Sequence, residues 1–179
     1  NGCASRKVRK GNVSAQMAGE PNPRHTPLLG IAELNRALDA ICGRAQRSIR
    51  IFDQTLGRDY NAPVRCEILR KFLLSSRSNR LQIVVHDTQP LDRNCPRLLM
   101  LLRTYGHAIL VHETHVNAKS VYDPFVVVDD GCFVHRFHFD ELRGLMGVDD
   151  PIGTHTLAKR FEEIWEASSP AVSATTLGL

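Results

Sequence analysis

The sequence of 179 residues lacks any apolar run that approaches the roughly 20 residues needed for a helix to cross a membrane. We therefore expect a cytoplasmic protein without a membrane partner. A CxxC pair is also missing, and the five cysteines are odd in number and widely scattered. This pattern is typical of reduced thiols in the cytosol, whereas a secreted disulfide scaffold would show a dense cysteine framework.

A strong charge of either sign is missing as well. The 23 Lys and Arg residues exceed the 19 Asp and Glu residues by four, and five of the basic residues lie within the first 24 positions. The rest of the chain is close to neutral, so charge alone gives weak support for a nucleic-acid partner. The basic N-terminal segment would attract phosphates without sequence preference, but it has no aromatic residue for base stacking.

Both ends of the chain lack helical or strand periodicity. Residues 1–27 are rich in Gly, Pro, Asn, Ser and basic side chains, which predicts a flexible basic arm. Residues 170–179 are small and polar and predict a flexible tail. We expect residues 28–169 to form one domain, because a chain of this length suffices for one core and is short for two.

Between these ends, segments with helical spacing alternate with short apolar or alternating segments. The first predicted helix begins at 31 and ends near 43–45, and the other predicted helices cover 64–75, 94–104 and 154–167. The predicted strands cover 48–53, 81–85, 108–112, 125–128 and 132–137. The last two strands are joined by Asp129-Asp130-Gly131, a strong hairpin signal. The order predicts an α/β domain with a mixed, mostly parallel sheet, helices on both faces and a late β-hairpin.

This order of elements resembles a half-domain of the phospholipase D-type phosphodiesterases over about 140 residues. The resemblance depends on the strands SIRIFD and LQIVV, the strand after Tyr105-Gly106-His107, the hairpin, and a closing helix with Phe161 and Trp165. Family members carry a His-x-Lys-x-x-x-x-Asp motif on the first hairpin strand and a Gly-Ser-x-Asn segment at the end of the second. Active members pair two such halves around one site, so the resemblance implies a homodimer for a single half.

The motif residues are largely replaced in this chain. Tyr122 stands at the histidine position, Pro124 at the lysine position and Asp129 at the aspartate position, while His135-Arg136-Phe137-His138 replaces the Gly-Ser-x-Asn segment. In active members the resemblance implies a histidine that attacks phosphorus and lysines that stabilise charge on the phosphoryl oxygens. A phenol is a poor substitute for that imidazole, and proline has no side-chain donor. We therefore predict a non-catalytic domain.

A vestigial site that binds an anionic or phosphate-containing ligand, or a nucleic acid, is the predicted function. Two strands end at the carboxyl edge of the sheet with Asp53-Gln54 and His86-Asp87, and ligands collect at such edges. Arg136 is the main expected anion contact, because a guanidinium grips phosphate with two parallel hydrogen bonds. Asp129 also suits a tight turn, which leaves its role open. The predicted ligand-binding residues are Tyr122, Asp129, His135, Arg136 and His86.

Two alternatives remain. In a displaced motif, His115 and Lys119 are four residues apart and share a face of an extended segment, so a rearranged phosphodiesterase or nuclease would use His115, Lys119, Asp129 and His135. Alternatively, histidines three residues apart, as at 112 and 115 or 135 and 138, would contribute to a metal site. Residues three apart on a strand face opposite sides, so we predict neither a metal nor a cofactor.

Overall fold

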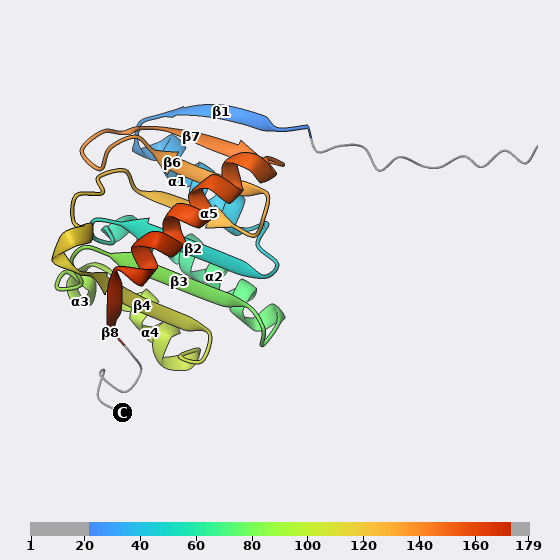
Figure 1. Cartoon of the computed structure of the whole chain (residues 1–179). Helices are drawn as coiled ribbons and strands as arrows, with labels where there is room; N and C mark the ends of the chain where they lie inside the picture. The colour runs from blue at the N-terminus through green and yellow to red at the C-terminus, as the bar shows by residue number, and fades with distance from the viewer. Residues whose placement is uncertain (1–21, 173–179) are drawn as a thin grey trace, which may run out of the picture.

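One eight-stranded sheet forms the centre of the protein in the computed structural model, which describes residues 22–172 (Figure 1). The strand order is β1-β7-β6-β5-β2-β3-β4-β8. The middle of the sheet contains the parallel strands β2 (Ser48–Asp53), β3 (Arg80–Val85) and β4 (Ile109–Thr114). Only these two of the seven strand pairings among the described residues are parallel, so the prediction of a mostly parallel sheet is wrong.

The antiparallel pairings lie on both sides of this parallel centre. The predicted hairpin is confirmed as β5 (Phe125–Val128) and β6 (Cys132–Arg136), and β5 pairs with β2. Strand β7 (Arg143–Val148), which the sequence did not predict, then pairs with both β6 and β1 (Arg24–Leu29). Strands β1, β7, β6 and β5 therefore form one antiparallel half of the sheet.

The two edge strands extend beyond the predicted domain limits of 28 and 169. Residues 24–27 belong to β1, and residues 170–172 belong to β8 (Ser168–Val172), which pairs with β4. Both strands contain a proline; β1 has a single buried side chain and β8 has none, so they show no apolar alternation. Residues 1–21 of the predicted arm and 173–179 of the predicted tail lie outside the described residues.

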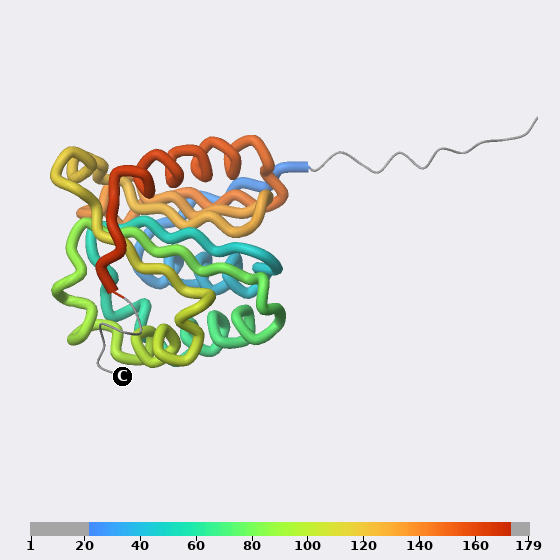
Figure 2. The backbone as a smooth tube through the Cα atoms, turned by 60° about the horizontal axis from the view of Figure 1, so that its bottom comes forward, coloured from blue at the N-terminus to red at the C-terminus, as the bar shows by residue number. Residues whose placement is uncertain are grey.

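Helices cover both faces of the sheet, as predicted (Figure 2). One face packs against α1 (Ile31–Cys42), α2 (Pro63–Ser75) and α4 (Pro96–Thr104), and the other against α5 (Pro151–Glu166). The short helices are α3 (Leu91–Asn94) and the 3₁₀ helices η1 (Arg58–Asn61) and η2 (Val116–Ala118). No helix within residues 22–172 is both long and apolar enough to span a membrane.

Alternate residues of the strands supply two separate hydrophobic clusters. On β6, Val134 belongs to the larger cluster beside α1, whereas Phe133 belongs to the smaller cluster beneath α5. Successive side chains of a strand point to opposite faces, so Arg136 points to the α1 face and His135 to the α5 face. This alternation decides which of the predicted site residues meet.

Candidate functional site

The carboxyl ends of the parallel strands meet the start of β5 and the end of β6 at one edge of the sheet. Phe52 of β2 pairs with Phe125 of β5, which in turn pairs with His135 of β6. The residues beside these pairs, Asp53 and Arg136, therefore lie at the same edge. In open α/β sheets ligands bind at this edge.

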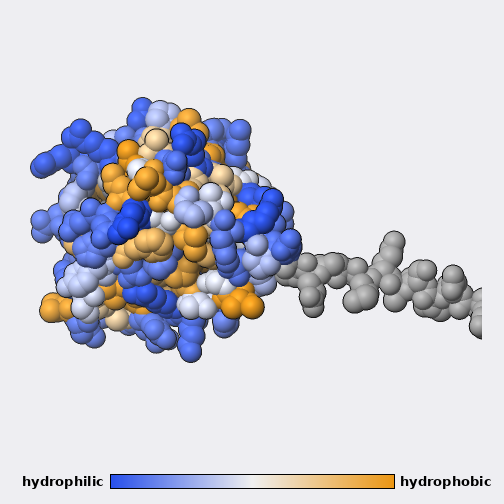
Figure 3. All heavy atoms as spheres, turned by 90° about the horizontal axis from the view of Figure 1, so that it is seen from above, coloured by the Kyte–Doolittle hydropathy of each residue, from blue (hydrophilic) through white to orange (hydrophobic). Residues whose placement is uncertain are grey.

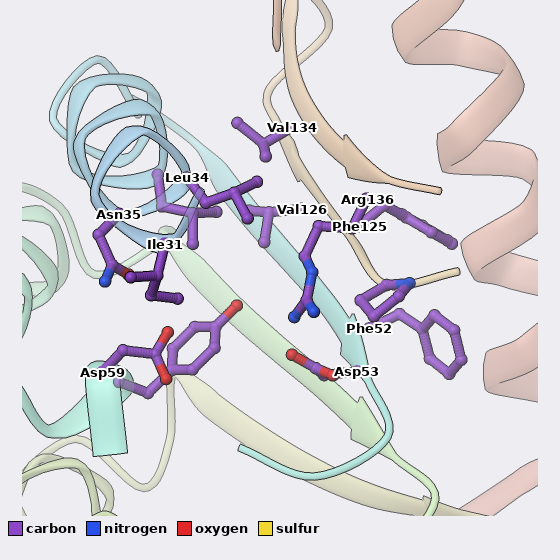
Figure 4. A pocket seen from close by; sticks show the side chains of 13 residues that line it. Ile31, Leu34, Asn35, Phe52, Asp53, Asp59, Phe125, Val126, Val134 and Arg136 are labelled. Carbon is purple, nitrogen blue, oxygen red and sulfur yellow. The ribbon is translucent and has the colours of Figure 1, made fainter. Parts of the chain in front are cut away.

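A pocket opens at this edge between the sheet and α1 (Figure 4). Its cavity volume is about 30 Å³, which is space for roughly two water molecules. Most of its lining is apolar and includes Pro124. The polar side chains of the lining are Asn35, Asp53, Asp59, Tyr60 and Arg136.

Asp53 is a carboxyl group of the pocket whose pKa is raised. Burial raises its pKa from 3.8 to about 7, while a hydrogen bond from the backbone N–H of Gln54, the positive charge of Arg136 and the negative charge of Asp59 make smaller contributions. The Gln54 bond to Oδ1 is 2.7 Å long. Protonated and ionised Asp53 are therefore both populated at neutral pH.

Arg136 is held in place by the loop that follows it. Its Nη2 donates to the carbonyl oxygens of Phe139 at 2.5 Å and Glu141 at 3.2 Å, and its Nε donates to Glu141 at 3.4 Å. Nη1 makes no hydrogen bond with residues 22–172. Figure 4 shows the guanidinium directed across the pocket toward Asp53.

Tyr60 forms another wall, and a buried arginine fixes it. Only 5% of Tyr60 is exposed, and burial, followed by the nearby charges of Asp53 and Asp59, raises its pKa well above the ordinary value. Arg65 lies 5.3 Å from the centre of the Tyr60 ring. Its Nε donates to Asp39 at 2.8 Å and its Nη1 to Asp59 at 3.3 Å, so it ties η1 to α1.

Sequence reasoning missed both Tyr60 and Arg65. Tyr60 lies in a loop-like segment that shows no periodicity, and Arg65 occupies a helical position where a charged side chain suggests solvent. The sequence signal for the burial of Arg65 is its spacing from Leu69, because residues four apart share a helix face. Leu69 is buried, and Arg65 is buried with it.

Asp129 lies at the opposite end of the hairpin from the pocket. It has a positive φ of 49°, which Asp tolerates better than most residues, and its carboxylate accepts hydrogen bonds of 2.8–2.9 Å from the backbone N–H groups of Gln46, Arg47 and Ser48. The length of β2, about 17 Å, separates it from Asp53. Asp129 therefore stabilises the turn and does not line the pocket.

His86 is buried and hydrogen-bonded through both ring nitrogens. Its Nε2 lies 2.7 Å from the carbonyl oxygen of Val121, and its Nδ1 lies 2.7 Å from the hydroxyl of Thr114. A carbonyl only accepts, so Nε2 donates the proton and Nδ1 accepts from the threonine. Both ring nitrogens are satisfied within the fold, and His86 does not line the pocket.

His135 and Tyr122 both lie near the edge but outside the pocket. His135 faces α5, where its Nε2 lies 2.7 Å from Asp123, and that carboxylate also accepts two hydrogen bonds from Arg160. Tyr122 is 51% exposed, and its ring lies 5.9 Å from that of Phe139. Of the predicted ligand-binding residues, Arg136 alone lines the pocket.

The alternative catalytic set is dispersed. His115 follows β4 and pairs with Ser169 at 2.6 Å, whereas His135 lies on β6. Four strand spacings, about 19 Å, separate β4 from β6, and Asp129 lies at the far end of the hairpin. The structure therefore does not assemble His115, Lys119, Asp129 and His135 into one site.

The histidines of the region 107–138 also lie in different environments. His112 stacks on Trp165 with 3.7 Å between ring centroids, and burial lowers its pKa. His138 stacks on Phe139. Within residues 22–172, no group of three or more His, Cys, Asp or Glu side chains is arranged to hold a metal ion.

Comparison with solved structures confirms the predicted fold. The chain is similar to Nuc, a phospholipase D family member from Salmonella typhimurium, with a TM-score of 0.61 and 13% identity over 85% of this chain and 100% of that chain. It is similar to the archaeal chromatin protein TrmBL2, with a TM-score of 0.62 and 13% identity over 89% and 57% of the two chains. For phosphatidylserine synthase from Haemophilus influenzae Rd KW20, the TM-score is 0.56, with 17% identity over 87% and 42%. The chain therefore has a phospholipase D-like fold.

Comparison of the sequence with known proteins identifies one family of unknown function. No curated protein matches it. A family model described as "Domain of unknown function (DUF7931)" matches residues 31–177, which is most of the chain. The chain therefore belongs to the family of domains of unknown function DUF7931.

Proposed function

We propose that this chain is a non-catalytic phospholipase D-like domain that binds the phosphate group of a ligand in the pocket beside Arg136. The observation that carries the proposal is the chemistry of the pocket lining, which contains Arg136 but neither histidine nor lysine. Of the two residues that the resemblance aligns with the motif histidine and lysine, Pro124 lines the pocket without a donor, and Tyr122 is exposed and does not line the pocket. The site retains positive charge for binding and lacks the imidazole that would attack phosphorus.

The environment of Arg136 supports the binding of an anion. Its Nε and Nη2 are occupied by backbone carbonyls, which hold the side chain without neutralising its charge. Partial protonation of Asp53 at neutral pH reduces the opposing negative charge. The small cavity suits a single oxyanionic group rather than a whole nucleotide. A structural neighbour, TrmBL2, is described as a DNA-binding chromatin protein, which is consistent with a phosphate-containing ligand.

Binding is tested by NMR titration of the purified chain with dimethyl phosphate. We expect shift changes in residues of the pocket, and we expect Arg136→Gln to weaken binding at least tenfold. Arg47→Gln is the matched control, because Arg47 is an exposed arginine that pairs with Asp130 at the hairpin turn, far from the pocket. Equal binding by the wild type and Arg136→Gln would contradict the proposed site.

The absence of catalysis is tested with bis(p-nitrophenyl) phosphate. We expect no hydrolysis above the rate in buffer, because the pocket lining contains no imidazole to attack phosphorus. Hydrolysis that disappears in His115→Ala or His135→Ala would instead establish a phosphodiesterase with a rearranged site.

A homodimer is the proposed assembly. Three large apolar side chains are exposed near the β1 edge: Leu29 (70%), Ile31 (49%) and Leu142 (45%). They lie close together because the backbone N–H of Gly30 donates a hydrogen bond to the carbonyl oxygen of Leu142. Figure 3, seen from above β1, shows apolar side chains exposed among hydrophilic ones on this face. Light scattering should give a solution mass of twice 20.0 kDa, and a monomer at all concentrations would contradict the assembly.

A further inference from the structure

Three polar atoms at the pocket make no hydrogen bond with any residue in the described part of the chain. They are the hydroxyl of Tyr60, Nη1 of Arg136 and Oδ2 of Asp53, and they come from η1, β6 and β2. All three atoms are in contact with solvent. The fully buried side-chain atoms without a hydrogen-bond partner in the described residues are Oδ1 of Asn79 and Oγ1 of Thr154, which lie elsewhere in the fold. Tyr60 is 95% buried, yet its hydroxyl opens into the pocket without a protein partner. Because no residue of the described chain occupies these three groups, they are free to form hydrogen bonds with a ligand that enters the pocket.

All three groups are able to donate a hydrogen bond to the same oxyanion. The guanidinium and the phenol donate in their ordinary states, and a carboxyl group donates when it is protonated. We propose that the pocket takes up a small phosphodiester monoanion together with one proton, with Arg136, Tyr60 and protonated Asp53 donating to its oxygens. This inference rests on the proposed function and adds the coupling to a proton and the role of Tyr60. The proton comes from solvent and stays on Oδ2 of Asp53, so no covalent bond of the ligand changes.

The surroundings of Asp53 favour this coupling. Burial raises its pKa to about 7, so the proton is available near neutral pH. The charged or titratable groups that act on Asp53 are Arg136 from β6 and Asp59 and Tyr60 from η1. Strand β3 places Val85 beside Asp53, and α1 and β5 contribute no charged side chain to the lining. A bound anion adds a negative charge next to Asp53 and favours its protonated form further.

The apolar part of the lining sets the kind of ligand. The cavity has space for only about two water molecules, so the anionic oxygens of a ligand would enter it and the substituents would remain at its mouth. Ile31, Leu34 and Val126 belong to the lining, and apolar side chains favour small alkyl substituents over additional charge. A phosphodiester with short substituents presents one negative charge and apolar groups on either side. A dianionic phosphate monoester would bring a second charge that a single arginine does not neutralise.

The coupling is tested with dimethyl phosphate, which keeps a single negative charge throughout the pH range used, so any pH dependence belongs to the protein. Dissociation constants of the full chain are measured by NMR titration at pH 6, 7 and 8. We expect binding to weaken about tenfold between pH 6 and pH 8, as the pKa of about 7 for Asp53 predicts. Calorimetry at pH 8 in two buffers with different ionisation heats should show uptake of about one proton per bound ligand. Inorganic phosphate, tested in parallel at pH 8, should bind more weakly than the diester.

Two variants separate the roles of the donors. Asp53→Asn keeps a donor but does not titrate, so its affinity should be nearly the same at pH 6 and pH 8. Tyr60→Phe removes a hydroxyl that has no protein partner, so the fold should be unaffected while binding weakens about fivefold to tenfold at each pH, as expected for one lost hydrogen bond. Tyr105→Phe, a change outside the pocket, is the matched control and should bind as the wild type does.

The outcomes distinguish this inference from the proposed function. No binding at any pH would overturn both. Binding that requires Arg136 but has the same affinity at pH 6 and pH 8, without proton uptake, would overturn the coupling and leave the proposed function in place. Wild-type affinity in Tyr60→Phe would overturn the assignment of its hydroxyl as a ligand donor.

Discussion

Replacing Asp53 with asparagine should stabilise the protein, and the gain should depend on pH. The carboxyl group sits at the end of β2, only partly exposed, and burial is the main cause of its raised pKa. Asparagine has nearly the same shape and keeps an oxygen that accepts the hydrogen bond from the backbone N–H of Gln54. The substitution therefore removes the charge while it preserves the local structure.

The size and sign of the effect follow from the two pKa values of Asp53. In the folded protein the pKa is about 7, whereas the ordinary value of the unfolded chain is 3.8. Between these values the folded protein retains a proton that the unfolded chain has released, so each pH unit of increase lowers the free energy of unfolding by about 1.4 kcal/mol. The penalty is absent below pH 3.8 and complete above pH 7, where the full shift corresponds to about 4 kcal/mol. Solvent contact makes this an upper limit, and we expect about 2–4 kcal/mol at pH 8.

Urea unfolding at pH 5 and pH 8 measures the effect. The stability advantage of Asp53→Asn over the wild type should grow by about 2–3 kcal/mol between these pH values, because most of the titration of Asp53 falls between them. Asp92→Asn, an exposed substitution in α3, is the matched control and should change stability by less than about 0.5 kcal/mol at either pH. An advantage for Asp53→Asn that is equal at the two pH values would refute the reasoning.

Three further substitutions test the supports of the fold, each by urea unfolding. Asp129→Ala removes the acceptor of three backbone N–H groups and should cost about 2–3 kcal/mol without altering ligand binding, whereas the exposed Asp130→Ala should cost less than about 1 kcal/mol. Arg65→Met leaves two carboxylates without their buried partner and should cost about 3 kcal/mol, while Arg70→Met, at an exposed ion pair, should cost under about 1 kcal/mol. Gly144→Ala would place a Cβ atom 2.5 Å from a backbone oxygen of β6, so it should lower the free energy of unfolding by about 1–3 kcal/mol. An unchanged free energy of unfolding would mean that β6 and β7 separate easily at this point.

Local patterns predicted most of the elements well. Strand β2 was predicted at 48–53, where the structure has it, and helix α1 was predicted to end near 43–45 and ends at Cys42, because apolar periodicity is a property of each segment by itself. The Asp-Gly turn was predicted for the same reason, since its residues favour the left-handed backbone that Asp129 adopts. The edge strand β1 contains Pro27 and lacks alternation, so only its pairing with β7 reveals it.

The sequence by itself determined which residue types are present in the segment that resembles the phospholipase D motif, including Tyr122 and Pro124, which carry neither an imidazole nor an amine. The tertiary structure decided which side chains meet. Whether His135 or Arg136 faces the pocket depends on which face of the sheet α1 covers, and Tyr60 reaches the pocket because Arg65 ties η1 to α1. Such arrangements arise from contacts between segments that are distant along the chain, and a local pattern carries no information about those partners.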